Sequence, residues 1–422
     1  MAPDHPTIGC PLPALAGGPV YLDYNATTPC FPEVAEAMAP FLGMHFGNPS
    51  SGHTYGRVCK AALDTARAQV AQLINASPSE IYFCSCGTEA DNWAIYGAVT
   101  AKRRSMLEAN GGLPHVVTSA IEHIAVLAYL QHLSDQKLCT FTAVPVSPSG
   151  MVCPQDVAAA LTPNTVLVSI MHSNNEVGSL QPIREIAAVA AAAGVLMHTD
   201  AAQSIGKVGV DVKLLGVDML SLVGHKFGAP KGGGCTVHQL AEGPPSRSLY
   251  TPRNGVTLQN FLYGGGQEGG RRAGTENVLL IVGLGAAAQL AAGRAQAARH
   301  HMEAMRDRLQ RQLLEQLPKD RAAVNGPSES HLRLPNTLSI SISGFSASTA
   351  LHQLRDALAV SAGSACHSAS SISHVLKAMQ ILPEAALGTL RCSTHAYTTD
   401  EDVSCAVKLI VGEASRQWDQ QH

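Results

Sequence analysis

The sequence predicts an α/β protein whose large domain is built on a mainly parallel sheet, followed by a smaller α+β domain toward the C-terminus. Strand-length runs of β-branched and apolar residues alternate with helical stretches through the first two thirds of the 422-residue chain. This alternation is typical of parallel sheets covered by helices. The chain length suits one large or two moderate domains, and a hydrophobic content of 45% supplies ample material for a core.

The first expected strand covers residues 80–85 (EIYFCS) and runs into Gly87-Thr88-Glu89, where a helix begins that continues to about Val99. The segments 115–119, 140–146 and 165–171 are also strand-like. A helix is expected over 183–193, because Gly194 suits the position just after a helix end. Two further strands follow, one over 195–199 that ends on Asp200 and one over 217–222 that ends near Lys226.

The last third of the chain has a different character. The glycine-rich stretches 224–234 and 264–274 contain charged residues, which indicates loops rather than linkers. A long helix from about Val282 to Leu317 and a strand over 337–342 are expected next, and Thr399-x-x-Asp402 resembles a capping box that opens a final helix. The predicted domains are 34–282 for the large one, and 1–33 with 283–422 for the small one.

Composition and charge exclude several classes of protein. The 29 basic and 32 acidic residues give a net charge of −3 without a basic tract, which disfavours a nucleic-acid binder. No run approaches the roughly 18 consecutive apolar residues of a membrane span. The 11 cysteines are scattered and odd in number, a pattern of a reducing compartment. No secretory signal is expected, because an apolar stretch is missing and no Lys or Arg precedes Arg57. We expect a cytoplasmic protein, with an organelle as the alternative, and no metal site.

Four features fall where expected strands end, which is where parallel sheets bind ligands. They are Asp200, Lys226, His123 and the segment Cys86-Gly87-Thr88 at the start of a helix. Each has an ordinary explanation on its own. Asp200 could cap a helix, Lys226 could be a solvated charge, and His123 could be a satisfied polar residue. A helix N-terminus alone is a weak signal for an anion site.

Together these features meet the needs of one cofactor, pyridoxal 5′-phosphate (PLP). PLP requires a lysine for a Schiff base, a carboxylate that keeps its ring nitrogen protonated, and donors for its phosphate. Lys226, Asp200 and the helix that begins at Gly87 supply these three groups. The sequence therefore predicts a PLP enzyme.

Ordered motifs run through nearly the whole chain, between Tyr21 and Arg391. They are Tyr21–Pro29, Gly47–Ser51, Gly87–Ala90, Glu122-His123, Asn174–Gly178, His198–Gln203, Gly224–Lys226, the loop Gly264–Thr275 and Ser361–Ser368. In these motifs the sequence resembles the class V, fold-type I PLP enzymes of the cysteine desulfurase and selenocysteine lyase family. The resemblance implies the fold-type I architecture, with a seven-stranded type of sheet in the large domain.

The resemblance also implies roles for the cofactor site. Lys226 would form the Schiff base and move protons, Asp200 would pair with the ring nitrogen, and His123 would stack on the ring and assist acid–base steps. The remaining contacts would be made by two groups of residues: Gln203 and Asn175 on the side of the 3-oxygen, and Thr88, His225 and Thr275 on the phosphate. Thr275 would come from the partner subunit of a homodimer.

For the substrate, the resemblance implies that Asn48 and Arg391 clamp the carboxylate, a task for which a guanidinium is well suited. Cys366 would be the nucleophile that takes up sulfur or selenium. Its Ser/Ala/Gly-rich surroundings, residues 361–371, offer little to bury and are typical of a loop rather than a core.

Three hypotheses for the function follow: a cysteine desulfurase or selenocysteine lyase, another class V enzyme, and a non-catalytic scaffold. The first is a cysteine desulfurase that makes L-alanine from L-cysteine and hands sulfur to an acceptor protein, and close behind it is a selenocysteine lyase. Another class V aminotransferase or lyase is disfavoured by Cys366, since a transaminase has no use for a nucleophilic thiol. A non-catalytic scaffold for sulfur transfer is disfavoured by the intact set of Lys226, Asp200, His123 and Cys366.

Several positions depart from the family pattern. The family usually has Gly at Cys86, Asn at Asp91 and often Arg at Gly269, and many desulfurases have Ser at Val223. Val223 and the motif Ala365–Ser368 are closer to selenocysteine lyases. After Arg391, the usual Ser-x-Gly-Arg is replaced by Cys392, Ser393, Thr394 and His395. Cys86 and Cys392 are interpreted as small buried fillers.

Overall fold

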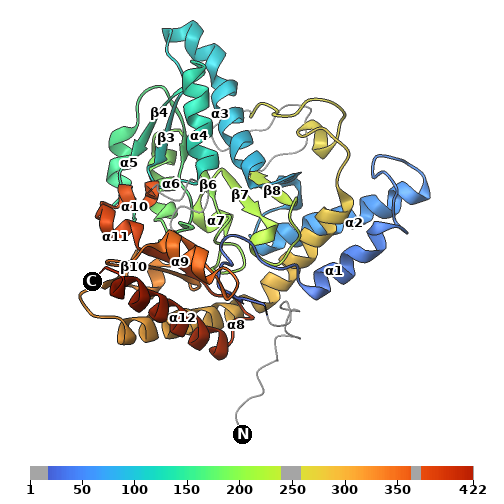
Figure 1. Cartoon of the computed structure of the whole chain (residues 1–422). Coiled ribbons are helices and arrows are strands. Elements are labelled where there is room, and N and C mark those ends of the chain that lie inside the picture. The colour runs from blue at the N-terminus through green and yellow to red at the C-terminus, as the bar shows by residue number, and fades with distance from the viewer. Residues whose placement is uncertain (1–17, 239–257, 363–371, 422) are drawn as a thin grey trace. The chain divides into compact units, whose positions relative to one another are not determined.

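The computed structural model describes residues 18–238, 258–362 and 372–421 (Figure 1). The chain forms two compact units. The larger holds residues 28–175 and 179–295, and the smaller holds the described residues up to Thr27, the short segment 176–178 and the chain from Gln296 onward. The division falls inside helix α8 (Val278–Gln316), and the predicted domain boundary after residue 282 lies within the same helix.

The larger unit contains a seven-stranded sheet with the order β2-β8-β7-β6-β5-β3-β4. Its strands are β2 (Ile81–Cys84), β3 (His115–Ser119), β4 (Thr140–Val144), β5 (Thr165–Ser169), β6 (Leu196–Asp200), β7 (Met219–Val223) and β8 (Gly234–His238). Only β8 runs antiparallel to its two neighbours. The expected mainly parallel sheet is therefore confirmed, and six strands end at the same edge.

Helices connect these strands. They are α1 (Pro32–Met38), α2 (Thr54–Leu73), α3 (Gly87–Asn110), α4 (Ile124–Asp135), α5 (Pro154–Ala160), α6 (Ile183–Ala192) and α7 (Val212–Leu215), with short 3-10 turns η1 (Ala39–Leu42), η2 (Pro78–Glu80), η3 (Gly224–Lys226) and η4 (Glu268–Gly270). Helix α6 ends as predicted, with Gly194 at φ +69°. Helix α3 is longer than expected, because it continues past Val99 until Gly111 adopts the left-handed conformation.

The core of the larger unit lies on the central strands. Every residue of β3, β5, β6 and β7 is buried, whereas the edge strand β4 is largely exposed. Continuous burial is expected for parallel strands that are covered on both faces. One buried cluster joins α3 and α4 to the sheet, and includes Trp93, Ile95, Val116, Leu130 and Leu167.

Helix α8 is long and apolar enough to cross a membrane by length and composition, but half of its most apolar stretch is buried inside the protein. Small residues allow this close packing. A Cβ at Gly285 would lie 2.6 Å from Ala66 of α2, and one at Gly283 would lie 2.6 Å from Met38 of α1. The start of α8 is thus shaped to pack on α1 and α2, as in the core of a globular protein.

The smaller unit has an antiparallel sheet of order β12-β13-β10-β9 and a two-stranded parallel pair, β1 with β11. The strands are β1 (Val20–Tyr21), β9 (Ala322–Asn325), β10 (Thr337–Ile342), β11 (Leu358–Ala359), β12 (Ser361–Ala362) and β13 (Thr389–Ser393). The helices are α9 (Ala347–Leu354), α10 (His374–Ala378), α11 (Pro383–Leu387) and α12 (Asp400–Asp419), with the turn η5 (Ser330–Leu332). The predicted capping box is present: Thr399 and Asp402 bond each other's backbone N–H groups.

Candidate active site

The predicted cofactor residues gather at the carboxyl ends of the parallel strands. Asp200 is the last residue of β6, and Lys226 lies in η3 directly after the neighbouring strand β7. The others follow the ends of their strands: His123 follows β3, Thr88 follows β2 at the start of α3, Asn175 follows β5, and Gln203 follows β6. One edge of one sheet thus carries these residues, as the strand pattern predicted for Asp200, Lys226, His123 and Thr88; the predicted cofactor residue Thr275 lies elsewhere, before α8.

Asp200 is buried with only 7% of its surface exposed. Burial raises the pKa of its carboxyl group, whereas the nearby positive charges of His123 and Lys226 lower it. Its Oδ1 accepts the N–H of Ala202 at 2.8 Å, but turns and no helix follow Asp200, so the interpretation of Asp200 as a helix cap is wrong. A buried carboxylate at the end of β6 is suited to pair with a positively charged group of a ligand.

The turn that carries Lys226 is held by a segment distant in sequence. The carbonyl of His225 accepts bonds from the N–H and the hydroxyl of Thr28 at 2.8 and 3.0 Å, and the N–H of Gly228 donates to the same hydroxyl at 2.8 Å. Gly228 has φ +92°, and a Cβ there would lie 2.2 Å from the ring of Phe31. Residues 28–31 therefore fix the backbone on both sides of Lys226.

The two histidines of the site differ in their burial. Burial lowers the pKa of His225 to about 4, and the charges of Lys226 and Lys231 add to this effect. His225 is therefore neutral at physiological pH and can donate one hydrogen bond. The ring of His123 is exposed, and its Nδ1 accepts the N–H of Ala125 at 3.2 Å, which places the proton of a neutral His123 on Nε2.

Helix α3 presents its N-terminus at the same edge of the sheet. Cys86 occupies the N-cap position but makes no side-chain capping bond, so it satisfies none of the first-turn N–H groups. A Cβ at Gly87 would lie 2.4 Å from Cγ2 of Val223, which shows how closely α3 approaches the end of β7. Cys86 itself is exposed, so the interpretation of Cys86 as a buried filler is wrong; Cys392 is buried, as expected.

Two further carboxyl groups are buried beside Asp200. Burial raises the pKa of Asp91 well above its usual range, with the charge of Asp200 as the next cause. Burial also raises the pKa of Glu122 to about 8, against the bonds that it accepts from the Ser119 hydroxyl at 2.5 Å and the Met171 N–H at 3.0 Å. A protonated Asp91 is neutral, as is the asparagine that the family usually has at this position.

The glycine-rich loop before α8 is anchored by two ion pairs with paired contacts. Arg67 binds Glu268 at 2.6 and 2.9 Å, and Arg272 binds Glu89 of α3 at 2.8 and 3.1 Å. Gly269, where the family often has Arg, adopts φ +63°, which favours glycine. Thr275 follows this anchored loop and is exposed.

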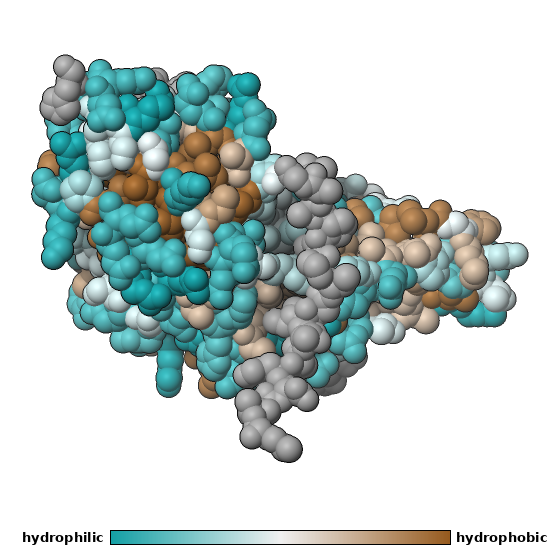
Figure 2. Space-filling model, turned by 60° about the horizontal axis from the view of Figure 1, so that its bottom comes forward, coloured by the Kyte–Doolittle hydropathy of each residue, from teal (hydrophilic) through white to brown (hydrophobic). Residues whose placement is uncertain are grey.

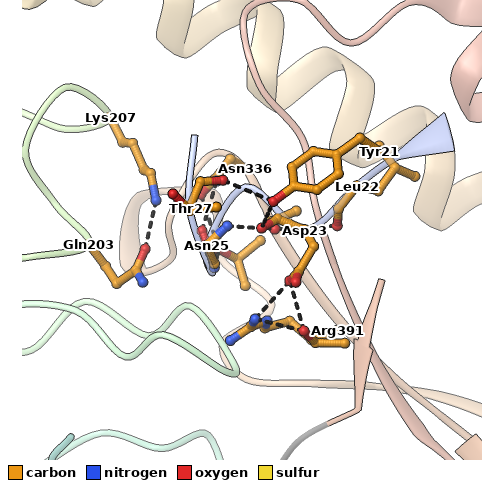
Figure 3. Close-up of polar contacts among 12 residues, drawn as sticks. Tyr21, Leu22, Asp23, Asn25, Thr27, Gln203, Lys207, Asn336 and Arg391 are labelled. Atoms are coloured by element: carbon orange, nitrogen blue, oxygen red, sulfur yellow. Dashed lines mark hydrogen bonds and ion pairs between the residues drawn. The ribbon is translucent and has the colours of Figure 1, made fainter. Parts of the chain in front are cut away.

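Arg391 lies on β13 of the smaller unit and is buried. Its Nη2 donates to Asp23 at 2.8 Å and to the Ser361 hydroxyl at 3.0 Å, and Ser361 also donates to Asp23 (Figure 3). Asp23 and Ser361 thus hold Arg391 in place, and the sequence did not predict these contacts. Glu176 of the same unit has a pKa that burial raises to about 7, while Ser373 and Arg391 lower it.

The remaining predicted residues are Asn48, Cys366 and the altered segment after Arg391. Asn48 is exposed in the larger unit, where its Oδ1 accepts the N–H of Ser50 at 2.9 Å. Cys366 lies outside the described residues. In the altered segment after Arg391, the Thr394 hydroxyl donates to the Met302 carbonyl at 2.9 Å, and the His395 ring stacks on Tyr24 with 4.6 Å between centroids. Both residues stabilise the smaller unit locally.

Comparison with known proteins assigns the family. The family model "Aminotransferase class-V" matches residues 20–405. The chain belongs to this family. It is 40% identical over 393 residues to "Cysteine desulfurase IscS" of Clostridium botulinum, strain Hall, and the match covers 93% of each chain. A solved structure called "NIFS-LIKE PROTEIN" is 34% identical with a TM-score of 0.82, covering 94% of this chain and 100% of that one. Another, "SspA in complex with cysteine", is 32% identical with a TM-score of 0.71, covering 90% and 99%.

The expected fold-type I architecture and the PLP dependence of a class-V enzyme are thereby confirmed. The donor set of the larger unit fits this cofactor. Asp200 supplies a buried carboxylate, Lys226 supplies an amine within its electrostatic reach, and the N-terminus of α3 and the neutral His225 supply hydrogen-bond donors.

Three residues that contact predicted site residues were not predicted from the sequence. Thr28 supports the Lys226 turn, Asp23 holds Arg391, and Lys207 bonds Gln203. Thr28 and Asp23 stand within the motif Tyr21–Pro29, which marked the segment but not the contacts. Lys207 lies four positions after Gln203 in a non-helical turn, and no sequence pattern pointed to their contact.

Proposed function

We infer that this chain is a PLP-dependent cysteine desulfurase, which converts L-cysteine to L-alanine and transfers the sulfur to an enzyme cysteine. The similarity to a cysteine desulfurase over 93% of both chains carries this conclusion. It is supported by the arrangement of Asp200, Lys226 and His123 at one sheet edge. A similar solved structure is described as a complex with cysteine, which supports the same substrate here.

Bound PLP supplies an electron sink for charge that develops on the substrate Cα. The residues of this chain prepare the site for that task. Asp200, whose ionised form Lys226 and His123 favour, would keep the ring nitrogen of bound PLP protonated. Lys226 has an amine that can take the proton from the substrate Cα and return one later, and a neutral His123 carries its proton on Nε2.

The substrate needs a carboxylate partner and a sulfur acceptor. Arg391, oriented by Asp23 and Ser361, is the proposed guanidinium for the carboxylate, with Asn48 as its companion. The thiolate of Cys366 attacks the substrate Sγ, so that an S–S bond forms while the Cβ–Sγ bond breaks. The carbon skeleton keeps the electron pair, takes up a proton and leaves as alanine. Cys366 then passes its persulfide sulfur to an acceptor protein.

We propose that the enzyme is a homodimer joined through the arm patch, defined as four strongly exposed apolar side chains of η1, the start of α2 and the loop between them. These are Leu42 at 74%, Met44 at 74%, Phe46 at 73% and Tyr55 at 60% exposure. Figure 2 shows hydrophobic surface on the side of the molecule where α1 and α2 lie in Figure 1. The rings of Phe46 and Tyr55 lie 5.3 Å apart between centroids. Clustered exposed apolar side chains mark association sites, and a second copy is the occupant that could also deliver Thr275.

The cytoplasm remains the proposed location. All eight cysteines whose side chains the structure describes are free thiols, which suits a reducing compartment. Neither nucleic acid nor a membrane is part of the proposed function.

The test is alanine formation by the purified holoenzyme with L-cysteine and L-selenocysteine, compared for the wild type and Cys366→Ala. We expect turnover of L-cysteine that Cys366→Ala abolishes while the yellow colour of the bound cofactor remains. Lys226→Ala should lose that colour. Cys405→Ala is a matched control, because Cys405 is an exposed thiol on α12 and should leave turnover unchanged. A Cys366→Ala enzyme with the wild-type rate on L-cysteine would contradict the nucleophile assignment.

A selenocysteine lyase is the second candidate, since Val223 stands where many desulfurases have Ser and the segment Ala365–Ser368 resembles lyases. Turnover confined to L-selenocysteine in the same assay would establish this alternative. Alanine from neither substrate would indicate another class V reaction.

A further inference from the structure

A lysine that the proposed chemistry does not use is buried beside the cofactor residues. Lys207 is only 4% exposed, and its Nζ donates to Oε1 of Gln203 at 2.7 Å (Figure 3). Gln203 is 5% exposed. Burying an ammonium group is costly unless hydrogen bonds compensate for lost water, so a lysine at this position calls for an explanation.

The bond determines which way the Gln203 amide faces. An amide has one acceptor oxygen and one donor NH₂ group on opposite sides. Because the ammonium group of Lys207 can only donate, it binds the oxygen and turns Nε2 of Gln203 away from itself. The side chain of Gln203 is thereby presented as a donor to whatever lies on its other side.

The backbone around this pair is firmly placed next to Lys226. The N–H of Lys207 donates to the Ser204 carbonyl at 3.1 Å, and that of Ser204 donates to the Ala201 carbonyl at 2.9 Å. Gly206, at φ +76°, lies so close to Phe227 that a Cβ there would approach the Phe227 Cβ to 2.9 Å. The turn from Asp200 to Lys207 thus packs against the residue that follows Lys226.

We propose that Lys207 is a positioning residue: it fixes the Gln203 amide so that Nε2 donates to the 3-oxygen of bound PLP. This inference rests on the proposed function. A donor at the 3-oxygen stabilises its negative form, and therefore lowers the pH at which the bound cofactor loses its shared proton. Without Lys207 the amide is free to turn its oxygen toward the same place, where it would repel that negative charge.

The test is a pH titration of the visible absorption band of the holoenzyme, together with the dissociation constant of PLP. We expect Lys207→Met to raise the apparent pKa of the band by about one pH unit. Gln203→Ala should raise it in the same direction. In the double variant the two effects should not add, because both substitutions remove the same hydrogen bond. Lys213→Met, at an exposed helix position, is the control and should titrate like the wild type.

Two results would overturn the proposal: an unchanged band pKa in Lys207→Met, or shifts that add in the double variant, which would mean that Lys207 acts through its own charge. Lys207→Gln provides a second route and decides the question if Lys207→Met does not fold. Its amide keeps a donor without the charge, so we expect a band pKa close to the wild-type value, and a full shift would contradict the positioning role. A wild type without any visible band would instead refute the proposed function itself.

Discussion

Three carboxyl groups are buried at the cofactor edge of the sheet, and burial raises the pKa of each: Asp91, Glu122 and Asp200. Burial raises the pKa of Glu122 to about 8, so this carboxyl group is mostly protonated near pH 7, and burial raises the pKa of Asp91 well above its usual range. Burial also lowers the pKa of His198 to about 3, which makes this neighbour of Asp91 neutral as well. Asp200 alone has positive groups, His123 and Lys226, that favour its ionised form.

The state of Glu122 predicts a pH dependence of folding stability. Its pKa is raised from 4.5 to about 8, so the folded state keeps a proton that the unfolded state releases above pH 4.5. The free energy of unfolding contributed by Glu122 therefore falls as pH rises from 4.5 to 8, with a slope of at most about 1.4 kcal/mol per pH unit. Glu122→Gln keeps the acceptor oxygen for Ser119 and Met171 and cannot ionise. We expect this variant to lose that downward slope.

Urea unfolding at pH 5, 6, 7 and 8, at one protein concentration, measures the effect as the difference between Glu122→Gln and the wild type. Buried histidines such as His172 and His198 contribute an opposite slope, which cancels in this difference. Glu36→Gln on exposed α1 is the control and should leave the slope unchanged. A constant difference between Glu122→Gln and the wild type across this range would show that Glu122 is ionised when folded.

At the scale of elements, the start of α3 depends on its contact with the end of β7. A Cβ at Gly87 would meet Cγ2 of Val223 at 2.4 Å, too close for any side chain without movement. We expect Gly87→Ala to displace the first turn of α3 and to weaken PLP binding about tenfold or more, a loss of at least about 1.4 kcal/mol.

Val223→Ala removes the methyl group that clashes, so the double variant Gly87→Ala/Val223→Ala should recover most of the PLP affinity. Fluorescence titration of the apoenzyme with PLP measures all three variants, and far-UV circular dichroism checks that each is folded. Equal losses in the single Gly87→Ala variant and the double variant would mean that Gly87 is required for its backbone and not for the space beside Val223.

The strands were the elements best predicted from sequence. A strand that is buried on both faces is recognisable as a short run of apolar and β-branched residues. β3 and β10 have the expected bounds, and β2, β5, β6 and β7 differ by one or two residues. Helix α2 and strand β8 were not predicted. The place of β8 between β2 and β7 depends on pairing with residues some 150 positions away, of which a local pattern carries no trace.

The sequence predicted which residues lie at the strand ends of the candidate site, but not the long-range contacts that hold those residues in place. Lys226, Asp200 and Thr88 could be expected at strand ends because topology brings those ends together. The bond from Gly228 to Thr28 spans 200 positions, and the one from Arg391 to Asp23 spans 368. Such contacts follow from the completed fold. The burial that gives Glu122 its raised pKa likewise follows only from the packed structure.

At the scale of the whole molecule, the proposed dimer makes each cofactor site depend on two chains. Thr275 is exposed at the end of a loop that Arg67 and Arg272 hold rigidly. An exposed residue at the end of a loop that ion pairs anchor is suited to reaching into a partner subunit. We therefore expect Phe46→Asp, in the arm patch, to shift the enzyme toward monomers in analytical ultracentrifugation and to weaken PLP binding in parallel. Leu382→Asp is the control, since Leu382 is an equally exposed apolar residue of the smaller unit.

A mixed dimer tests whether Thr275 acts across the interface. One chain carries Lys226→Ala and cannot form the yellow complex, and the other carries Thr275→Ala. If Thr275 acts in the partner's site, the Thr275→Ala chain receives an intact Thr275 from the Lys226→Ala chain, and its own Lys226 completes one normal site per dimer. Dimers tagged differently on the two chains and purified by both tags should then bind PLP at half the sites with wild-type affinity. If Thr275 acts within its own chain, every Lys226 faces a defective phosphate site, and the mixed dimer will bind no more tightly than the Thr275→Ala homodimer.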